Sequence, residues 1–190
     1  SKDANIAAAK TVTFYGVVTS SVGLTLQNGA TANFSGPNVA LNAVIIAANA
    51  GQGVARFDDT ASITKAIGAQ ATKLQLIDFT GTKASQVASV GADLFATNIN
   101  VGAQTIQATT NIKLSGTTSF NGSVINLAGP SKITLQSGAS KLAGDVTLGL
   151  TLNNDVAVGN IIVDGSAGAA SFDVNNANSV KLVITDNANL

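Results

Sequence analysis

The chain has 190 residues, of which 11% are charged, and its ten basic residues balance its ten acidic residues. Because nucleic-acid binding depends on clustered cations, this neutral balance with only scattered lysines excludes that class of partner. No apolar run reaches the roughly 18 residues of a membrane-spanning helix, and the absence of cysteine and histidine excludes disulfides, thiolate metal sites and histidine-based catalysis.

Short segments in which apolar and polar residues alternate occur along the whole chain. In chain order, examples are residues 24–26, 74–76, 112–114, 133–135, 146–148, 172–174 and 180–182. A period of two is typical of a β-strand with one buried face. Turn-forming pairs such as Asn28-Gly29 and Asp164-Gly165 separate these segments. We therefore expect an all-β protein.

In two segments the sequence is also compatible with a short helix. Residues 4–10 are rich in alanine and could form one helical turn. Within residues 82–94, the apolar residues Val87, Val90 and Leu94 have helical spacing, which indicates a short helix or a loop.

Internal similarity favours a repetitive architecture. The segment 24–36, LTLQNGATANFSG, resembles 133–144, ITLQSGASKLAG, and 112–122, IKLSGTTSFNG, is a shorter version. Ile112 and Ile133 lie about 21 residues apart, a length that suits one turn of three short strands. The sequence thus predicts a parallel β-helix, or β-solenoid, of about nine turns. A β-sandwich or jelly roll is the alternative, and residues 1–190 are expected to form a single repetitive domain.

Two stretches in the middle of the chain resemble a known family. Ile67-Gly68 is followed by Leu74, Ile77 and Phe79, and soon afterwards by residues 91–99, GADLFATNI. This pattern is similar to the passenger region of rickettsial outer-membrane autotransporters, the surface cell antigens of the outer-membrane protein A and B type. The resemblance implies a surface-exposed β-helical passenger that serves in adhesion to host cells or in a surface coat. It implies no catalytic residues, and the chain could be a fragment of a longer passenger.

Carboxylates on successive turns are the first candidates for chemistry, since polysaccharide lyases and hydrolases require them. Asp145 with Asp164, or Asp155 with Asp173, could share one face because the separation within each pair is close to the expected length of one turn. Their Asn and Gly neighbours favour a role in turns. We therefore expect no catalytic site and no enzyme.

Three further groups are weighed against ordinary structural roles. Asp58 and Asp59 beside Arg56 could bind calcium, although a solvated turn with a local ion pair is favoured and no metal or cofactor is expected. Phe14 and Tyr15 could form an exposed aromatic contact, although Phe14 alternates with Val12 as a core residue would. Lys65, Lys73 and Lys83 could form a weak basic face, although scattered lysines usually only solvate a surface.

The function predicted from these observations is a non-enzymatic structural or adhesin module on the bacterial cell surface. Its expected partner is a host-cell receptor or another copy of the chain. A self-assembling subunit of an extracellular fibre or surface layer is the second interpretation, because solenoid ends expose unpaired strands. The predicted assembly edge comprises Val180, Leu182, Val183 and Ile184.

Overall fold

The computed structural model describes residues 4–79, 86–121, 124–127, 132–152, 160–163, 170–173 and 177–186, with side chains for 4–79, 86–120, Ile133 and Leu135. These residues form strands and no helix. The strands are β1 (Ala4–Ile6), β2 (Thr11–Phe14), β3 (Val17–Thr19), β4 (Leu24–Leu26), β5 (Thr31–Phe34), β6 (Val39–Asn42), β7 (Ile45–Ala47), β8 (Gln52–Phe57), β9 (Ala61–Ile63), β10 (Leu74–Phe79), β11 (Val87–Val90), β12 (Leu94–Val101), β13 (Thr105–Ala108), β14 (Ile112–Asn121), β15 (Val124–Leu127), β16 (Lys132–Leu152), β17 (Asn160–Val163), β18 (Ala170–Asp173) and β19 (Ala177–Asp186). A search of the described residues for a helix able to cross a membrane finds none.

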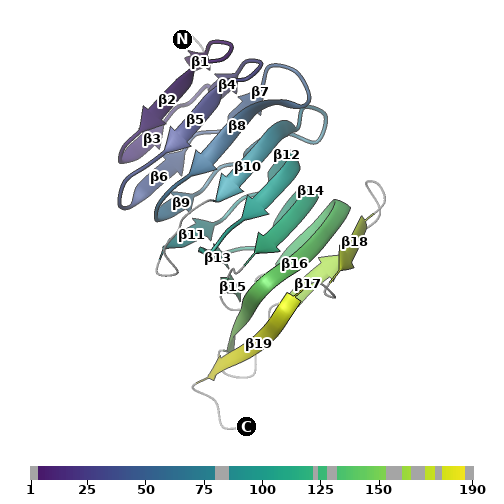
Figure 1. Ribbon diagram of the computed structural model, residues 1–190. Helices are drawn as coiled ribbons and strands as arrows, with labels where there is room; N and C mark the ends of the chain where they lie inside the picture. The colour runs from purple at the N-terminus through teal and green to yellow at the C-terminus, as the bar shows by residue number, and fades with distance from the viewer. Residues whose placement is uncertain are drawn as a thin grey trace.

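The strands wind into a solenoid with three sides (Figure 1). The first side contains β1, β4 and β7, the second contains β2, β5, β8, β10, β12 and β14, and the third contains β3, β6, β9, β11, β13 and β15. The long strand β16 joins the second and third sides. Every pairing among the described strands is parallel, which confirms the β-helix and excludes the antiparallel sandwich or jelly roll.

One turn of the solenoid spans about 22 residues. The predicted recurrence is confirmed in register, because Ile112 pairs with Ile133 and Leu114 pairs with Leu135. Five turns separate β2 from β14. The described strands form fewer turns than the nine expected for residues 1–190, and the turns differ in length. Lys132, for example, pairs with Asn160, so a longer segment separates these two partners.

Columns of identical or similar apolar side chains fill the interior. One column begins on the first side and continues through the first residues of β12, β14 and β16; it contains Leu24, Ile45, Ile67, Leu94, Leu114 and Leu135, all buried. On the second side, the rings of Phe14, Phe34, Phe57 and Phe79 stack with centroids 4.8–5.2 Å apart. These columns form because parallel in-register pairing places the same position of each turn above the last, about 4.8 Å away.

Where the structure describes them, both segments contain strands and no helix, so the helical alternative is wrong there. Ala4–Ile6 forms β1 and pairs with β4, and the chain then turns at Ala9, whose φ is +55°. Val87–Val90 forms β11 between β9 and β13. Val90 is buried and Val87 is only half-buried, which is the alternation of a strand. Hydrogen bonding to the neighbouring turns therefore overrides the local helical spacing.

Candidate functional site

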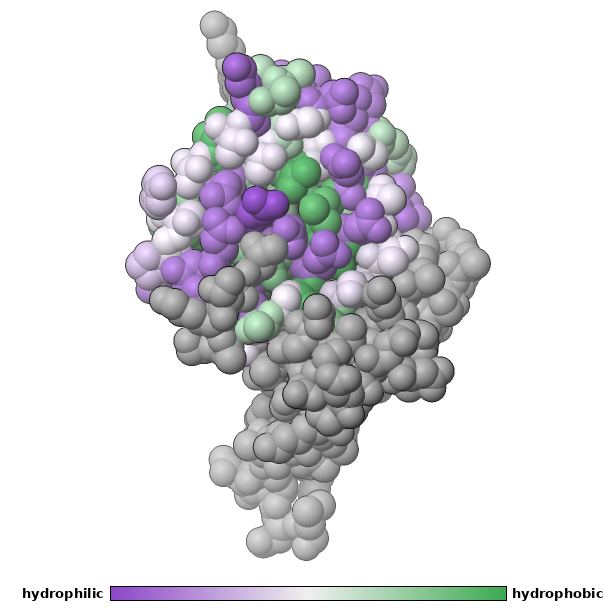
Figure 2. Space-filling view, in the orientation of Figure 1, coloured by the Kyte–Doolittle hydropathy of each residue, from purple (hydrophilic) through white to green (hydrophobic). Residues whose placement is uncertain are grey.

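The outer surface of the second side carries mostly polar side chains. Its side chains point outward because they alternate with the buried columns. Register pairing arranges them in two rows: Thr13, Asn33, Arg56, Asp78, Asn100 and Ser119 form the first, and Thr11, Thr31, Val54, Leu76, Asn98 and Thr117 form the second. Figure 2 shows a mostly hydrophilic surface around a small hydrophobic area.

An ion pair lies at the centre of the first row. Arg56 Nε is 3.5 Å from Asp78 Oδ2, and the Asp78 side chain is 8% exposed whereas that of Arg56 is 45% exposed. Burial raises the pKa of the Asp78 carboxyl, an effect that Arg56 opposes and Asp58 reinforces. The role of the Asp78 carboxyl is therefore mainly structural, as the partner of Arg56.

The neighbours of this pair supply hydrogen-bonding groups and apolar surface. Asn33 precedes Arg56 in the row, and its buried Oδ1 accepts no hydrogen bond. Asn100 follows Asp78 and is exposed, while Val54 and Leu76 lie half-buried in the adjacent row. This arrangement can bind a polar ligand or protein surface by hydrogen bonds and contact. It presents no pair of a nucleophile and a base among the side chains that the structure describes.

A second polar cluster lies at the corner between the second and third sides. Gln86 Nε2 donates to Asp59 Oδ1 at 3.0 Å, and Gln104 Nε2 donates to the main-chain oxygen of Asp59 at 3.1 Å. Both glutamines are buried, and the Oε1 atom of each has no hydrogen-bond partner. The two amides connect three successive turns, so this cluster stabilises the corner.

Sequence reasoning missed this corner cluster. The segment from Asp59 to Gln86 is longer than the repeat inferred from Ile112 and Ile133, and the segment from Gln86 to Gln104 is shorter. The available signal is that each glutamine directly precedes a strand of the third side, β11 or β13. An uncharged polar residue at the same corner of two turns indicates a ladder between turns.

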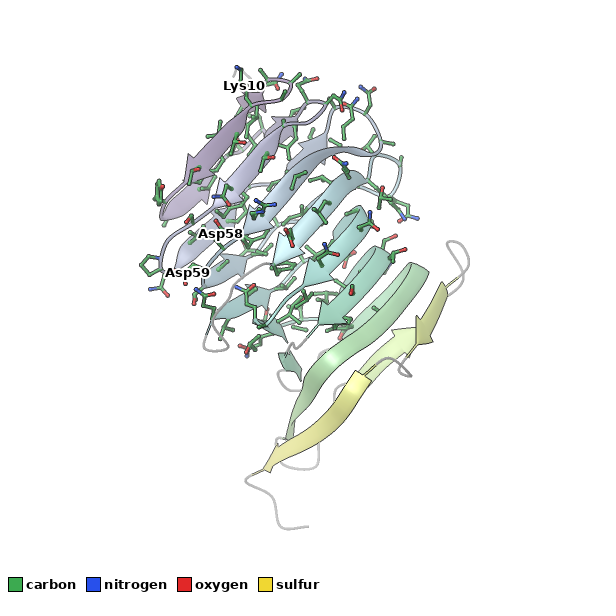
Figure 3. The ribbon with its side chains drawn as sticks, in the orientation of Figure 1. Lys10, Asp58 and Asp59 are labelled. Carbon is green, nitrogen blue, oxygen red and sulfur yellow. The ribbon has the colours of Figure 1, made fainter. Side chains whose placement is uncertain are left out.

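The residues weighed as a calcium site, Asp58 and Asp59 beside Arg56, make other contacts. Arg56 pairs with Asp78 of the following turn, whereas the sequence suggested an ion pair within its own turn. Asp59 Oδ1 accepts hydrogen bonds from the Thr60 N–H and from Gln86. Figure 3 shows Asp58 and Asp59 at the corner that ends the second side. Among the side chains described, no three His, Cys, Asp or Glu residues gather as a metal site would require.

The two aromatic residues of the first turn have different environments. Phe14 is half-buried and stacks on Phe34 at 5.2 Å, which confirms its assignment to the core. Tyr15 is 75% exposed, and its ring lies beside Gly36. Tyr15 therefore remains available for contact with a partner.

The remaining predicted residues form no described site. Lys65 is exposed and Lys73 is half-buried, while Lys83 lies outside the described residues. Asp155 and Asp164 also lie outside them. Asp145 belongs to β16 and Asp173 to β18, whose side chains are not described.

The predicted assembly edge lies on β19. The backbone of Val180, Leu182, Val183 and Ile184 pairs in parallel with residues 146–150 of β16. The side chains of these four residues lie outside the described set. The structure therefore places this edge on a strand at one end of the third side.

A scan against protein-family models and searches of curated proteins and of solved structures found no match to this chain.

Proposed function

We propose that this chain is a non-enzymatic structural and adhesive module of the bacterial cell surface, built like the passenger region of an autotransporter. The fold is compatible with this role, because a parallel solenoid is a rigid scaffold that presents long rows of side chains. The resemblance of residues 67–99 to rickettsial passengers supports the same location and the same class of partner, a host-cell receptor.

The observation that carries the proposal is the chemistry of the outer surface of the second side. Among its twelve described outward positions, asparagine, threonine and serine occupy eight, and the single carboxylate, Asp78, is paired with Arg56. A glycan-cleaving enzyme needs two carboxyl groups in defined roles. A surface with many neutral hydrogen-bonding groups is better suited to adhesion than to hydrolysis.

Binding of the purified chain to host cells tests this function. Exchange of the exposed residues Asn98 and Asn100 for glutamate should abolish saturable binding, because it adds two charges to the proposed surface. Exchange of Thr19 and Ser62 for glutamate adds the same charge to exposed positions on the third side and should leave binding unchanged. Equal binding by all three proteins, or cleavage of a host glycan by the unmodified chain, would contradict the proposal.

Self-assembly is the second candidate, and one observation favours it. Four of the five exposed large apolar side chains among the described residues lie in residues 12–22: Val12, Tyr15, Val17 and Val22. In that first turn Phe14 and Val18 are only half-buried, whereas their register partners Phe34 and Leu41 are fully buried. Parallel strands at the two ends of the third side, β3 and β19, could pair between copies without closing a ring.

Sedimentation of the 190-residue chain separates this candidate from adhesion alone. Association at micromolar concentration should be lost when Val12 and Val17 are both exchanged for lysine, or Leu182 and Ile184 likewise. Val44→Lys changes a valine of the next turn that is as exposed as Val12, and this variant should associate normally. A monomeric unmodified chain, or equal loss in the control, would contradict self-assembly.

A further inference from the structure

The turn between the first and second sides at Asn28-Gly29 combines exposure with an unusual backbone. The Ala30 N–H donates to the Gln27 oxygen at 3.0 Å, and Gly29 has a φ of +68°. Asn28 is not among the residues with positive φ, so the geometry is that of a type II turn with glycine at its third position. Asn28 and Gly29 are both exposed to solvent.

We infer that Asn28 is a site of spontaneous covalent modification, in which its amide is converted to aspartate or isoaspartate. The Gly29 nitrogen attacks Asn28 Cγ, the bond from Cγ to Nδ2 breaks, and ammonia leaves with the proton from the Gly29 N–H. Water then opens the resulting five-membered imide at either carbonyl. The net change replaces an NH₂ group with OH, which needs no oxidant, reductant or enzyme.

Three features make the Gly29 nitrogen accessible. Glycine has no Cβ, so nothing on Gly29 itself obstructs the approach to Asn28 Cγ. Within the described part of the chain, no acceptor is found for the Gly29 N–H, so closing the ring breaks no hydrogen bond there. The pair also lies in a turn, outside the hydrogen-bonded ladders that fix the neighbouring strands β4 and β5.

The other asparagines whose side chains the structure describes lack this combination. Asn98 and Asn100 are exposed, but they lie within β12 and are followed by the branched residues Ile99 and Val101. Asn49 is exposed in a turn at the corresponding corner of the next turn, but alanine follows it. Asn49 therefore provides an internal comparison that has the same exposure without the glycine.

The modification has a structural consequence at the first turn. The main-chain oxygen of Asn28 accepts a hydrogen bond from the Ala9 N–H at 2.9 Å. In isoaspartate the chain runs through Cγ, and this former carbonyl becomes a free carboxylate. The new charge appears at the corner that also carries the exposed Lys10 (Figure 3). The modification thus changes the contact between the first two turns and makes the neutral chain negative.

Mass spectrometry of the folded chain during prolonged incubation at neutral pH tests this inference. A mass increase of about one dalton, assigned by fragment masses to Asn28, should appear before any change at Asn49. Asn28→Gln should abolish the change at this position, because its longer side chain does not form the five-membered ring. Gly29→Ala should slow it at least about tenfold. The added Cβ has room, 3.6 Å from Ala9, but the φ of +68° strains an alanine, so the circular dichroism spectrum of this variant is compared with that of the unmodified chain.

The controls separate a property of the native turn from one of the unfolded chain. Asn49→Gln should leave the rate at Asn28 unchanged. Incubation in concentrated urea gives the intrinsic rate of the Asn-Gly pair, and the native rate should lie within about tenfold of it. A native rate far below the urea rate, a rate no faster than that of Asn49, or a change confined to Asn121-Gly122 would each overturn the inference.

Discussion

Phe57 lies in the middle of the phenylalanine column and provides the sharpest test of how the solenoid is stabilised. Its side chain is fully buried, and its ring stacks on Phe34 at 4.8 Å and on Phe79 at 5.1 Å. Truncation of a buried phenylalanine to alanine costs about 3–5 kcal/mol. Because each stacked pair contributes about 0.5–1.5 kcal/mol beyond burial, we expect Phe57→Ala to lie near the upper end, at about 4–5 kcal/mol.

Phe14→Ala is the matched comparison. Phe14 occupies the same column, but it is half-buried and stacks on one ring only, at 5.2 Å. Its truncation should cost roughly half as much, about 2 kcal/mol. Urea unfolding followed by far-ultraviolet circular dichroism measures both free energies. A cost for Phe57→Ala below about 1 kcal/mol, or one no larger than that of Phe14→Ala, would refute the assignment of stability to this column.

Three other predictions follow from backbone and charge. Gly68→Ala should destabilise the chain by more than about 2 kcal/mol, because the added Cβ would overlap the main-chain oxygen of Phe95. Gly51→Ala is the control, because Gly51 also has a positive φ but an added Cβ there meets no atom within 4 Å. Equal urea midpoints for the two variants would contradict the role of the overlap. The raised pKa of Asp78 means that the folded state binds a proton more readily than the unfolded state, whose value is near 3.8. The free energy of unfolding of the unmodified chain, relative to that of Asp78→Asn, should therefore fall as pH rises from about 3.8 through the folded-state pKa of Asp78. A difference between the two proteins that does not change with pH would contradict this prediction. The circular dichroism spectrum should be dominated by β-structure, and more than about a third of helix would disprove the fold.

The repeat could be recognised in the sequence because buried positions in successive turns require similar apolar residues. Ile112 and Ile133 are similar in sequence because they are adjacent in one buried column, so the spacing of one turn could be inferred directly. The lengths of the other turns could not be inferred from the sequence. The segment between the paired residues Ala61 and Ala88 is longer than the segment between Val87 and Thr105, because solvent-exposed corners accept insertions that leave the columns intact.

The candidate site was less predictable for a related reason. Alternation identifies which residues of a strand face outward, but the partner of each residue depends on the register between turns. Arg56 has Asp58 and Asp59 nearby in sequence, yet β8 and β10 align it with Asp78. The spacing from Arg56 to Asp78 is one residue longer than the spacing from Ile112 to Ile133, and a shift of one residue reverses the direction of every side chain.

The all-parallel pairing of the three sides determines how the molecule responds to force. Backbone hydrogen bonds connect strands of adjacent turns, so they run along the solenoid axis. Tension along that axis loads every boundary between turns equally, and the weakest boundary separates first. Each detached turn releases about 22 residues, which extend to about 70 Å at roughly 3.3 Å per residue. A solenoid with this construction is expected to lengthen in discrete steps, one turn at a time, while the other turns stay folded.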